Sequence, residues 1–238
     1  MTARLALVLL LGAAACREAS SEEAPVVAPP PPCAKCTLDV PANERGPVPL
    51  LVAMHGNHED GADASKRWKD SALARGWAVL GLHCPRDQGC ADGKWYKWSS
   101  TPAWVKQQVT EVVTKMPVDQ TRLFLAGWSG GATAIGMHAQ KWDRTFAAVV
   151  FHGGGQPPSI NRDECPRSLP AYFLVGDANP AHPAAKRLRD YYQGCEAEHV
   201  WDLMPGANHK MEDDALDTSK ANRILDWLEA HKRQPNIS

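Results

Sequence analysis

Six short, continuous apolar runs alternate with helical segments along this chain, and this alternation constrains the fold more than any other sequence feature. The runs lie at residues 49–54, 77–82, 122–126, 147–151, 171–175 and 198–203. Apolar spacing predicts helices at roughly 62–75, 102–116, 131–141, 181–193 and 214–232. Runs without polar alternation are typical of strands that are covered on both faces, as in a parallel sheet. The alternation therefore predicts an α/β fold, a three-layer α/β/α sandwich with a mostly parallel sheet.

The charge balance limits the classes of partner. The chain has 238 residues, with 26 lysines and arginines against 27 aspartates and glutamates, and its formal net charge is −1. Such a chain carries no broad cationic surface of the kind that binds a phosphate backbone, so we expect no nucleic acid partner. The absence of an internal repeat argues against a solenoid or a propeller.

The first fifteen residues have the composition of an export signal. Arg4 gives a positive start, Leu5–Leu11 form an apolar run, and the small residues Gly12–Ala15 lead to Cys16. The apolar and small residues together are too few to cross a bilayer as a helix, which takes about 20 residues. We therefore expect a signal peptide at 1–15 and a protein that is exported to the bacterial cell envelope or secreted.

The junction before Cys16 resembles a bacterial lipoprotein lipobox, in which a peptidase cleaves before a cysteine that then carries lipid. Ala13 departs from that pattern, which prefers Leu there, so plain cleavage after Ala15 is the alternative. A lipid anchor at Cys16 is the only membrane contact that we expect. Residues 16–32 end in four prolines and predict an extended tether, which places the folded domain at 33–238.

Six cysteines remain beside Cys16, and an even number in an exported chain suggests disulfides. Parity and local spacing favour three pairs, Cys84–Cys90, Cys165–Cys195 and Cys33–Cys36. A C-x-x-C such as the last can also be a redox motif or half of a zinc site. No second C-x-x-C completes a zinc site, and we interpret the pair as a staple near the start of the domain.

The pentapeptide Gly127-Trp128-Ser129-Gly130-Gly131 directly follows the third apolar run and precedes a predicted helix. A serine at a sharp strand-to-helix turn is held in strained backbone geometry, and small neighbours allow the strand and the helix to approach closely. The helix N-terminus and the Gly130 N–H would face an oxyanion that forms there. The pattern predicts Ser129 as a nucleophile, and the alternative is a glycine-rich turn without chemistry.

Two later loops carry the other groups that such a serine needs. Asp177 ends the fifth apolar run, and His209 lies in the loop after the sixth. Because the carboxyl ends of parallel strands meet at one edge of a sheet, we expect these loops to converge on Ser129. His209 would take the serine proton as general base, and Asp177 would orient the imidazole. Asp202 and Asp213 are alternatives for the acid.

With these residues in the order Ser, Asp, His, the chain resembles an α/β-hydrolase over nearly all of the folded domain. In that family a His-Gly pair, here His55-Gly56, precedes a residue that supplies an oxyanion N–H, here Asn57, beside that of Gly130. The chain is most similar to secreted bacterial esterases related to feruloyl esterases and polyhydroxybutyrate depolymerases. Dienelactone-hydrolase and carboxylesterase or thioesterase-like branches are close. The resemblance implies ester hydrolysis through an acyl-serine, with no metal and no organic cofactor.

Aromatic residues crowd into the loop after the second apolar run: Trp95, Tyr96, Trp98 and Trp104. They could form a wall for a phenolic acyl group, a sugar or a polyester, or else only cover the sheet. Trp95 and Trp98 are our candidates for substrate contact within this group. Trp128 and His152 are further candidates, although a loop histidine with satisfied hydrogen bonds is the alternative for His152.

Two other functions stay open beside a serine carboxylesterase acting on small-molecule or polymer-derived esters. A serine peptidase of the same fold would also form an acyl-serine, although such peptidases usually carry an added propeller or lid domain. A surface lipoprotein that binds a ligand without turnover would be favoured by a missing triad residue, and all three types are present. The sequence does not predict the oligomeric state.

Overall fold

The computed structural model describes residues 27–42, 45–159, 164–166 and 169–234. They form one seven-stranded sheet with the strand order β1-β3-β2-β4-β5-β6-β7. The strands are β1 (Thr37–Asp39), β2 (Val48–Met54), β3 (Ala78–Leu82), β4 (Val118–Trp128), β5 (Ala148–His152), β6 (Ala171–Gly176) and β7 (His199–Met204). Only the pairing of β1 with β3 is antiparallel among these strands. The sheet is mostly parallel, as predicted, and β1 is an edge strand that the apolar pattern did not reveal.

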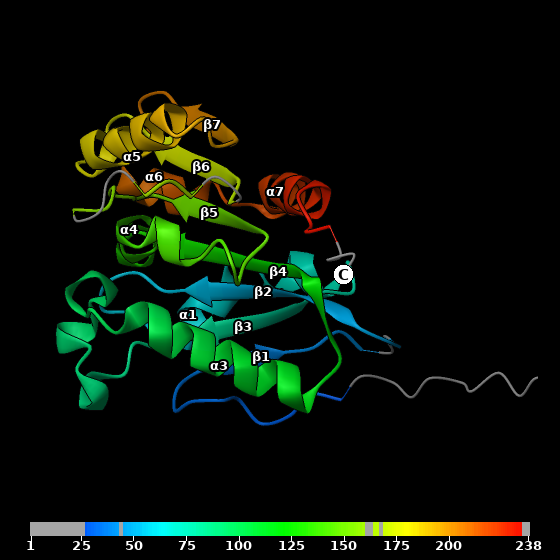
Figure 1. Ribbon diagram of the computed structural model, residues 1–238. Coiled ribbons are helices and arrows are strands. Elements are labelled where there is room, and N and C mark those ends of the chain that lie inside the picture. Colours follow the sequence, from blue (N-terminus) through cyan, green and yellow to red (C-terminus); the bar gives the residue numbers. More distant parts are fainter. Residues whose placement is uncertain (1–26, 43–44, 160–163, 167–168, 235–238) are drawn as a thin grey trace, which may run out of the picture.

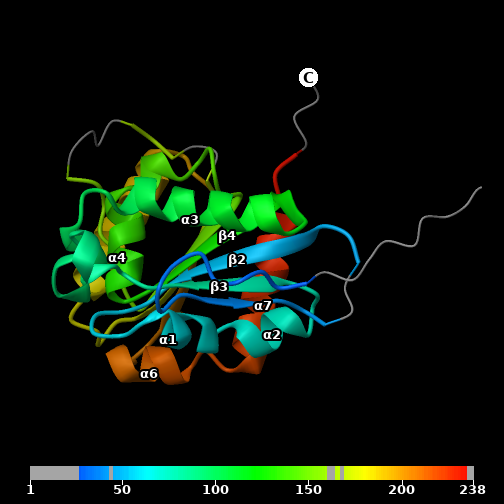
Figure 2. The ribbon, with the colours of Figure 1, turned by 90° about the horizontal axis from the view of Figure 1, so that it is seen from below.

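Helices cover both faces of this sheet (Figures 1 and 2). One face carries α3 (Thr101–Lys115), α4 (Gly130–Met137) and α5 (His182–Gly194), and the other carries α1 (Gly61–Lys66), α2 (Lys69–Leu73) and α7 (Thr218–Ala230). The short α6 (His209–Asp214) follows β7. The described residues also form four 3-10 turns: η1 (Arg86–Gln88), η2 (Ala91–Gly93), η3 (Trp95–Lys97) and η4 (Ala139–Lys141). The fold is the predicted three-layer α/β/α sandwich.

Two hydrophobic cores separate the layers. In β2, Leu50, Val52 and Met54 belong to the core under α3, α4 and α5, whereas Leu51 and Ala53 belong to the core under α1, α2 and α7. Successive side chains of a strand point to opposite faces, so a strand that is buried on both faces must be apolar at every position. All seven residues of β2 are buried, which explains the continuous apolar runs of the sequence.

One predicted helix is divided in the structure, and another begins later than predicted. The segment 62–75 consists of α1 and α2, separated by Arg67 and Trp68, and the Trp68 ring is buried in the core beneath them. The segment 214–232 corresponds to α7, which is capped by Asp217, and a separate α6 precedes it. Helix α6 begins at His209, a residue that we expected in a loop, because Asn208 caps it by accepting a hydrogen bond from the Met211 N–H at 3.0 Å.

The three predicted cysteine pairs are formed. The Cα atoms lie 5.3 Å apart in Cys33–Cys36, 5.7 Å apart in Cys84–Cys90 and 5.4 Å apart in Cys165–Cys195. The predicted signal peptide, Cys16 and most of the tether lie outside the described residues. Within the described ranges, no helix has both the length and the apolar character needed to span a bilayer.

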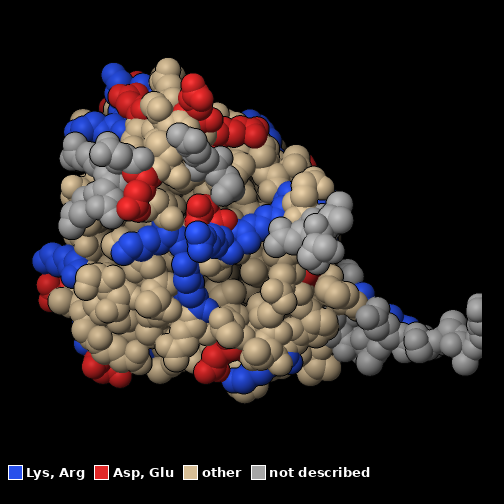
Figure 3. Space-filling model, viewed as in Figure 1, with Lys and Arg blue, Asp and Glu red and all other residues tan. Residues whose placement is uncertain are grey.

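Lysine and arginine side chains gather over the face that α3 covers (Figure 3). Lys106, Lys141 and Arg144 line a cavity of about 680 Å³, which Asp143 and Glu164 also line. Charges of both signs therefore meet in this cavity, in keeping with the nearly neutral balance of the whole chain.

Candidate active site

Ser129 stands at the sharp turn between β4 and α4. Its backbone has φ 50° and ψ −108°, a conformation that residues with a Cβ rarely adopt. The Ser129 N–H donates to the His152 carbonyl at 2.8 Å, which ties the turn to the end of β5. A Cβ on Gly131 would lie 2.6 Å from the Met54 carbonyl oxygen, so this neighbour of the serine must be small. The predicted strained elbow is present.

His209 faces this serine. Its Nε2 lies 2.9 Å from the Ser129 Oγ, which is hydrogen-bond distance for proton transfer to a general base. Ser129 stands directly between β4 and α4, and His209 is the first residue of α6, in the segment that follows β7. Two residues 80 positions apart in the sequence thus meet at the carboxyl edge of the sheet.

The carboxylate that holds the other side of this imidazole belongs to Glu212. Its Oε2 lies 3.0 Å from the His209 Nδ1, and its side chain is fully buried. Glu212 Oε1 accepts from the Gly176 N–H at 2.5 Å, and Oε2 accepts from the Asn179 Nδ2 at 2.5 Å. The Ala181 N–H donates to the Asn179 Oδ1 at 2.8 Å and fixes the orientation of that amide. A buried carboxylate needs such partners, and the loop after β6 provides them.

Asp177, which we expected in this position, lies elsewhere. Its side chain is exposed, and its Oδ1 accepts from the Gly206 N–H at 2.6 Å, joining the loops after β6 and β7. We expected the end of β6 to present the acid. The Asp177 side chain turns outward, and its neighbours Gly176 and Asn179 instead donate hydrogen bonds to Glu212. Two sequence signals point to Glu212: the capping residue Asn208 before the histidine, and the spacing of three residues that places both side chains on one helix face.

The two alternative acids are also engaged away from His209. The Asp213 Oδ1 accepts from the Arg67 Nε at 2.7 Å. The Asp202 Oδ2 accepts from the Tyr172 hydroxyl at 2.7 Å and from the Lys220 Nζ at 2.7 Å. Neither carboxylate therefore takes the place that Glu212 occupies beside the imidazole.

The two expected oxyanion donors lie side by side. The backbone nitrogen of Asn57 is 3.5 Å from the point where a Cβ on Gly130 would stand. Gly130 is the first residue of α4, so its N–H has no acceptor within the helix. Two N–H groups next to the serine can bind one oxygen, and the partial positive charge of the helix N-terminus favours an anion there.

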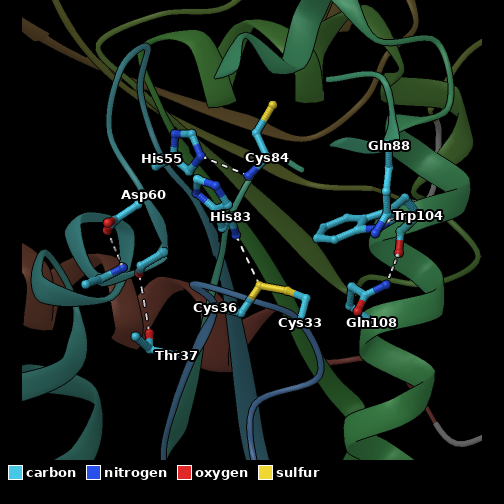
Figure 4. The surroundings of a disulfide bond; sticks show 12 residues. Cys33, Cys36, Thr37, His55, Asp60, His83, Cys84, Gln88, Trp104 and Gln108 are labelled. Atoms are coloured by element: carbon cyan, nitrogen blue, oxygen red, sulfur yellow. Dashed lines mark hydrogen bonds between the residues drawn. A yellow bond between two sulfur atoms is a disulfide. The ribbon is translucent and has the colours of Figure 1, made fainter. Parts of the chain in front are cut away.

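His55 braces the loop that carries Asn57, and Figure 4 shows its hydrogen bond to Cys84. Its Nδ1–H donates to the Gly56 carbonyl at 2.5 Å, and its Nε2 accepts from the Cys84 N–H at 3.1 Å. This pattern uses a neutral imidazole, and burial of the ring lowers the pKa of His55. The imidazole thus joins the loops after β2 and β3, and it fixes the peptide group of Gly56, the residue before Asn57.

The aromatic residues of the loop after β3 divide into buried and accessible groups. Trp95 is fully buried, with its ring 5.2 Å from that of His55 and 5.8 Å from that of Trp104. The Trp95 ring thus packs against His55, which braces the loop of Asn57. It has no exposed surface that could form a wall for a substrate. Trp98 and Tyr96 are partly exposed, and the Tyr96 hydroxyl lies 3.5 Å from the Asn57 Nδ2. Tyr96 is therefore the aromatic residue of this group that reaches the site.

Trp128 and His152 lie beneath the site, with 7% and 1% of their surface exposed. His152 Nε2–H donates to the Glu212 carbonyl at 2.8 Å, and burial lowers the pKa of His152 to about 4. His152 is therefore a neutral ring that supports the start of α6. We had considered both residues as candidates for substrate contact, and their burial leaves them little surface for it.

A cavity of about 500 Å³ opens beside the loop that carries Asn57. The loops after β2 and β3 and the Cys33–Cys36 turn line it, and its polar lining includes His58, which directly follows Asn57. Figure 4 shows this surrounding, where Cys36 Sγ accepts from the His83 N–H at 3.2 Å.

Known structures share the fold of this chain. A thermostable esterase superposes with a TM-score of 0.67 at 16% identity, over 83% of this chain and 59% of that chain. An S-formylglutathione hydrolase from Staphylococcus aureus gives a TM-score of 0.65 at 13% identity, over 81% of this chain and 89% of that chain. Est1E from Butyrivibrio proteoclasticus gives 0.60 at 14% identity, over 82% and 94%. This chain thus spans about three fifths of the thermostable esterase.

The sequence itself matches one protein family. No curated protein matches the chain. The sequence profile of the dienelactone hydrolase family matches residues 90–231, which is more than half of the chain and includes the Ser129 elbow and the His209 helix. The α/β-hydrolase fold that we predicted is confirmed, and the subtype that the sequence resembled most stays a prediction. The chain belongs to the dienelactone hydrolase family.

Proposed function

We propose that this protein is a serine hydrolase that cleaves carboxylic esters through an acyl-serine intermediate. Ser129 is the nucleophile, His209 the general base and Glu212 the acid that orients the base. One observation carries the proposal: His209 is hydrogen-bonded to the serine through Nε2, at 2.9 Å, and to a buried carboxylate through Nδ1, at 3.0 Å. Such a chain of three groups activates a hydroxyl that is otherwise a poor nucleophile near neutral pH.

The first half of the reaction forms the acyl-serine. The Ser129 Oγ attacks the ester carbonyl carbon while its proton passes to the His209 Nε2. The carbonyl oxygen becomes an anion, which the N–H groups of Asn57 and Gly130 bind. The C–O bond to the alcohol then breaks, and the Nε2 proton passes to the departing alcohol oxygen. Glu212 stabilises the imidazolium that exists between these two transfers.

The second half releases the acid. Water attacks the acyl carbon and gives its proton to the His209 Nε2, and the same two N–H groups bind the oxygen anion again. The bond between the acyl carbon and the Ser129 Oγ breaks, and the proton returns to that oxygen. The products are a carboxylic acid, an alcohol and free enzyme, so one water is consumed for each ester.

The test is labelling by a fluorophosphonate followed by peptide mass spectrometry. Such a probe phosphonylates a serine whose base and oxyanion donors are assembled. We expect one modified residue, Ser129, with the modification lost in denatured protein and in Ser129→Ala. Folded protein that is not modified at Ser129 would contradict the proposal and favour a binding protein without turnover. Acetyl, butyryl, feruloyl and hydroxybutyrate esters, with an amide beside them, then compare ester classes and ester against amide.

We propose an exported location for this enzyme, as a lipoprotein or in secreted form. The three disulfides support it, because such bonds persist in oxidising compartments. Expression in a bacterium with labelled palmitate is the test of the anchor. Label in the wild type that is lost in Cys16→Ala would support the lipoprotein form, and unlabelled protein cleaved after Ala15 would support the secreted form.

A further inference from the structure

We propose that Arg67 is a positioning residue. Its single guanidinium fixes three segments relative to one another: the loop that carries Asn57, strand β4, which ends before Ser129, and helix α6, which carries His209 and Glu212. This inference rests on the proposed function and adds a residue outside the triad and the oxyanion donors. Arg67 directly follows α1, far in the sequence from the serine and the histidine. Only 12% of its side chain is exposed.

All five N–H groups of this guanidinium have acceptors. Glu59 accepts from Nη2 at 2.8 Å and from Nη1 at 3.0 Å, and Asp213 accepts from Nε at 2.7 Å and from Nη2 at 3.3 Å. The fifth donor, on Nη1, reaches the Asp63 carbonyl at 3.2 Å. A guanidinium offers five donors in a fixed planar fork, so two carboxylates that occupy two of its edges are fixed relative to each other.

The two carboxylates belong to the loop that carries Asn57 and to the helix that carries His209 and Glu212. Glu59 lies two residues after Asn57, and its Oε2 also accepts from the Gly56 N–H at 2.8 Å. The position of Arg67 therefore fixes the peptide next to the proposed oxyanion donor. Asp213 directly follows Glu212, on the helix that begins with the catalytic histidine. The guanidinium thus links the donor loop with the helix of the base and the acid.

The nucleophile strand is joined to the same group through Trp128, the residue before Ser129. The guanidinium carbon of Arg67 lies 4.9 Å from the centroid of the Trp128 ring. The His209 ring lies 4.4 Å from that ring at an angle of 4°, which is a parallel stack. An aromatic ring binds cations at its face and stacks on flat rings, so Trp128 contacts both the arginine and the catalytic imidazole.

The space around Trp128 leaves little freedom for this arrangement. A Cβ on Gly56 would stand 2.7 Å from the Trp128 Cδ1, and a Cβ on Gly153 would stand 2.9 Å from its Cε3. The ring therefore occupies a slot that exists because two backbone positions lack side chains. A displacement of catalytic groups by about 1 Å can lower a rate by about a hundredfold, so residues that fix such a slot affect the chemical step.

Lysine at this position keeps the charge and loses the fork. We expect Arg67→Lys to lower kcat for p-nitrophenyl butyrate and the rate of phosphonylation of Ser129 by about tenfold or more, with KM changed by less than about twofold. The matched control is Arg122→Lys. Arg122 also pairs with two carboxylates, Asp119 at 2.7 Å and Glu229 at 3.7 Å, but lies near the opposite end of β4. Both rates should stay at the wild-type level in the control.

The outcomes separate this inference from the proposed function. If wild-type Ser129 is labelled and Arg67→Lys is labelled at the same rate with the same kcat, Arg67 only stabilises the fold and the inference is wrong. Equal losses in both arginine variants would also overturn it. If the wild type is not labelled, the proposed function fails and this inference falls with it.

A second variant serves if Arg67→Lys does not fold. Asp213→Asn keeps Arg67 and Glu59 paired and removes the bidentate contact to the catalytic helix, on a side chain that is 39% exposed. We expect a loss of kcat of about threefold to tenfold at unchanged KM. A kcat equal to that of the wild type in folded Asp213→Asn would show that the link to the helix has no role in catalysis.

Discussion

His209 and Glu212 lie three residues apart on α6, with the Nδ1 of the histidine 3.0 Å from the Oε2 of the glutamate. The proposed base and its proposed acid are therefore carried by one turn of one helix, and only the serine comes from a distant segment. Their relative geometry depends on a local structure, which Asn208 begins by capping the helix and which the loop after β6 supports through Gly176 and Asn179.

Glu212→Gln and Asp177→Asn form a matched pair that tests which acid is used. A glutamine can donate to the His209 Nδ1 and so favour the wrong tautomer, and we expect kcat to fall by about a thousandfold or more. Asp177→Asn changes an exposed side chain and should keep kcat within about threefold, because it lies outside the triad. The measurement is kcat for p-nitrophenyl butyrate with circular dichroism as a check of folding. The reverse order of losses would restore Asp177 as the acid.

Asn179→Asp tests the support of that acid. The substitution keeps the size of the side chain and replaces the Nδ2 donor, 2.5 Å from the Glu212 Oε2, by an oxygen. Two carboxylates at that distance cannot both ionise, so one must hold a proton and the hydrogen bond to the histidine is disturbed. We expect kcat to fall at least about tenfold. Asp177→Asn in the same loop is the control, and unchanged kcat in Asn179→Asp would show that the amide is dispensable.

The inner strands, such as β2, β3, β5 and β6, were predictable because they are buried on both faces and their runs had to be apolar, whereas the partly buried edge strand β1 gave no such run. The disulfides were predictable because six cysteines at these spacings left few sensible pairs. The proposed acid was not predictable, since chain order places it after β6, where Asp177 stands, and yet the Asp177 side chain turns outward and accepts from the Gly206 N–H. Sequence spacing gives the order of loops along a sheet edge but not the direction of each side chain. Trp95 was misplaced for the same reason, because an aromatic residue in a rim loop can turn inward.

Buried His152 predicts a loss of stability in acid. Burial lowers its pKa to about 4, below the value of about 6.5 in the unfolded chain. Between these two values the unfolded chain holds a proton that the folded chain does not, so the free energy of unfolding falls as the pH falls from about 6.5 toward 4. From pH 7 to pH 5 this histidine should account for a loss of about 2 kcal/mol.

Urea denaturation of the wild type and of His152→Gln at pH 7 and pH 5 checks this. The variant should lose less stability than the wild type over that interval, because glutamine does not titrate. A remaining loss is expected, since burial also lowers the pKa of His138 to about 4. An equal loss in both proteins would mean that His152 is protonated in the folded state at pH 5.

Gly153→Ala and Gly194→Ala compare a glycine under the site with one outside it. Gly153 has φ 62°, and a Cβ there would enter the Trp128 ring, with the Cε3 atom 2.9 Å away. We expect a loss of stability of about 2 kcal/mol or more and a lower kcat, because the ring that stacks on His209 must move. Gly194 ends α5 and a Cβ there meets nothing within 4 Å, so alanine should leave kcat unchanged and raise stability by up to about 1 kcal/mol.

Thermal unfolding and kcat, measured on both glycine variants, test this prediction. If Gly153→Ala lowers stability but leaves kcat intact, the stack of Trp128 on His209 is structural and has no part in placing the base.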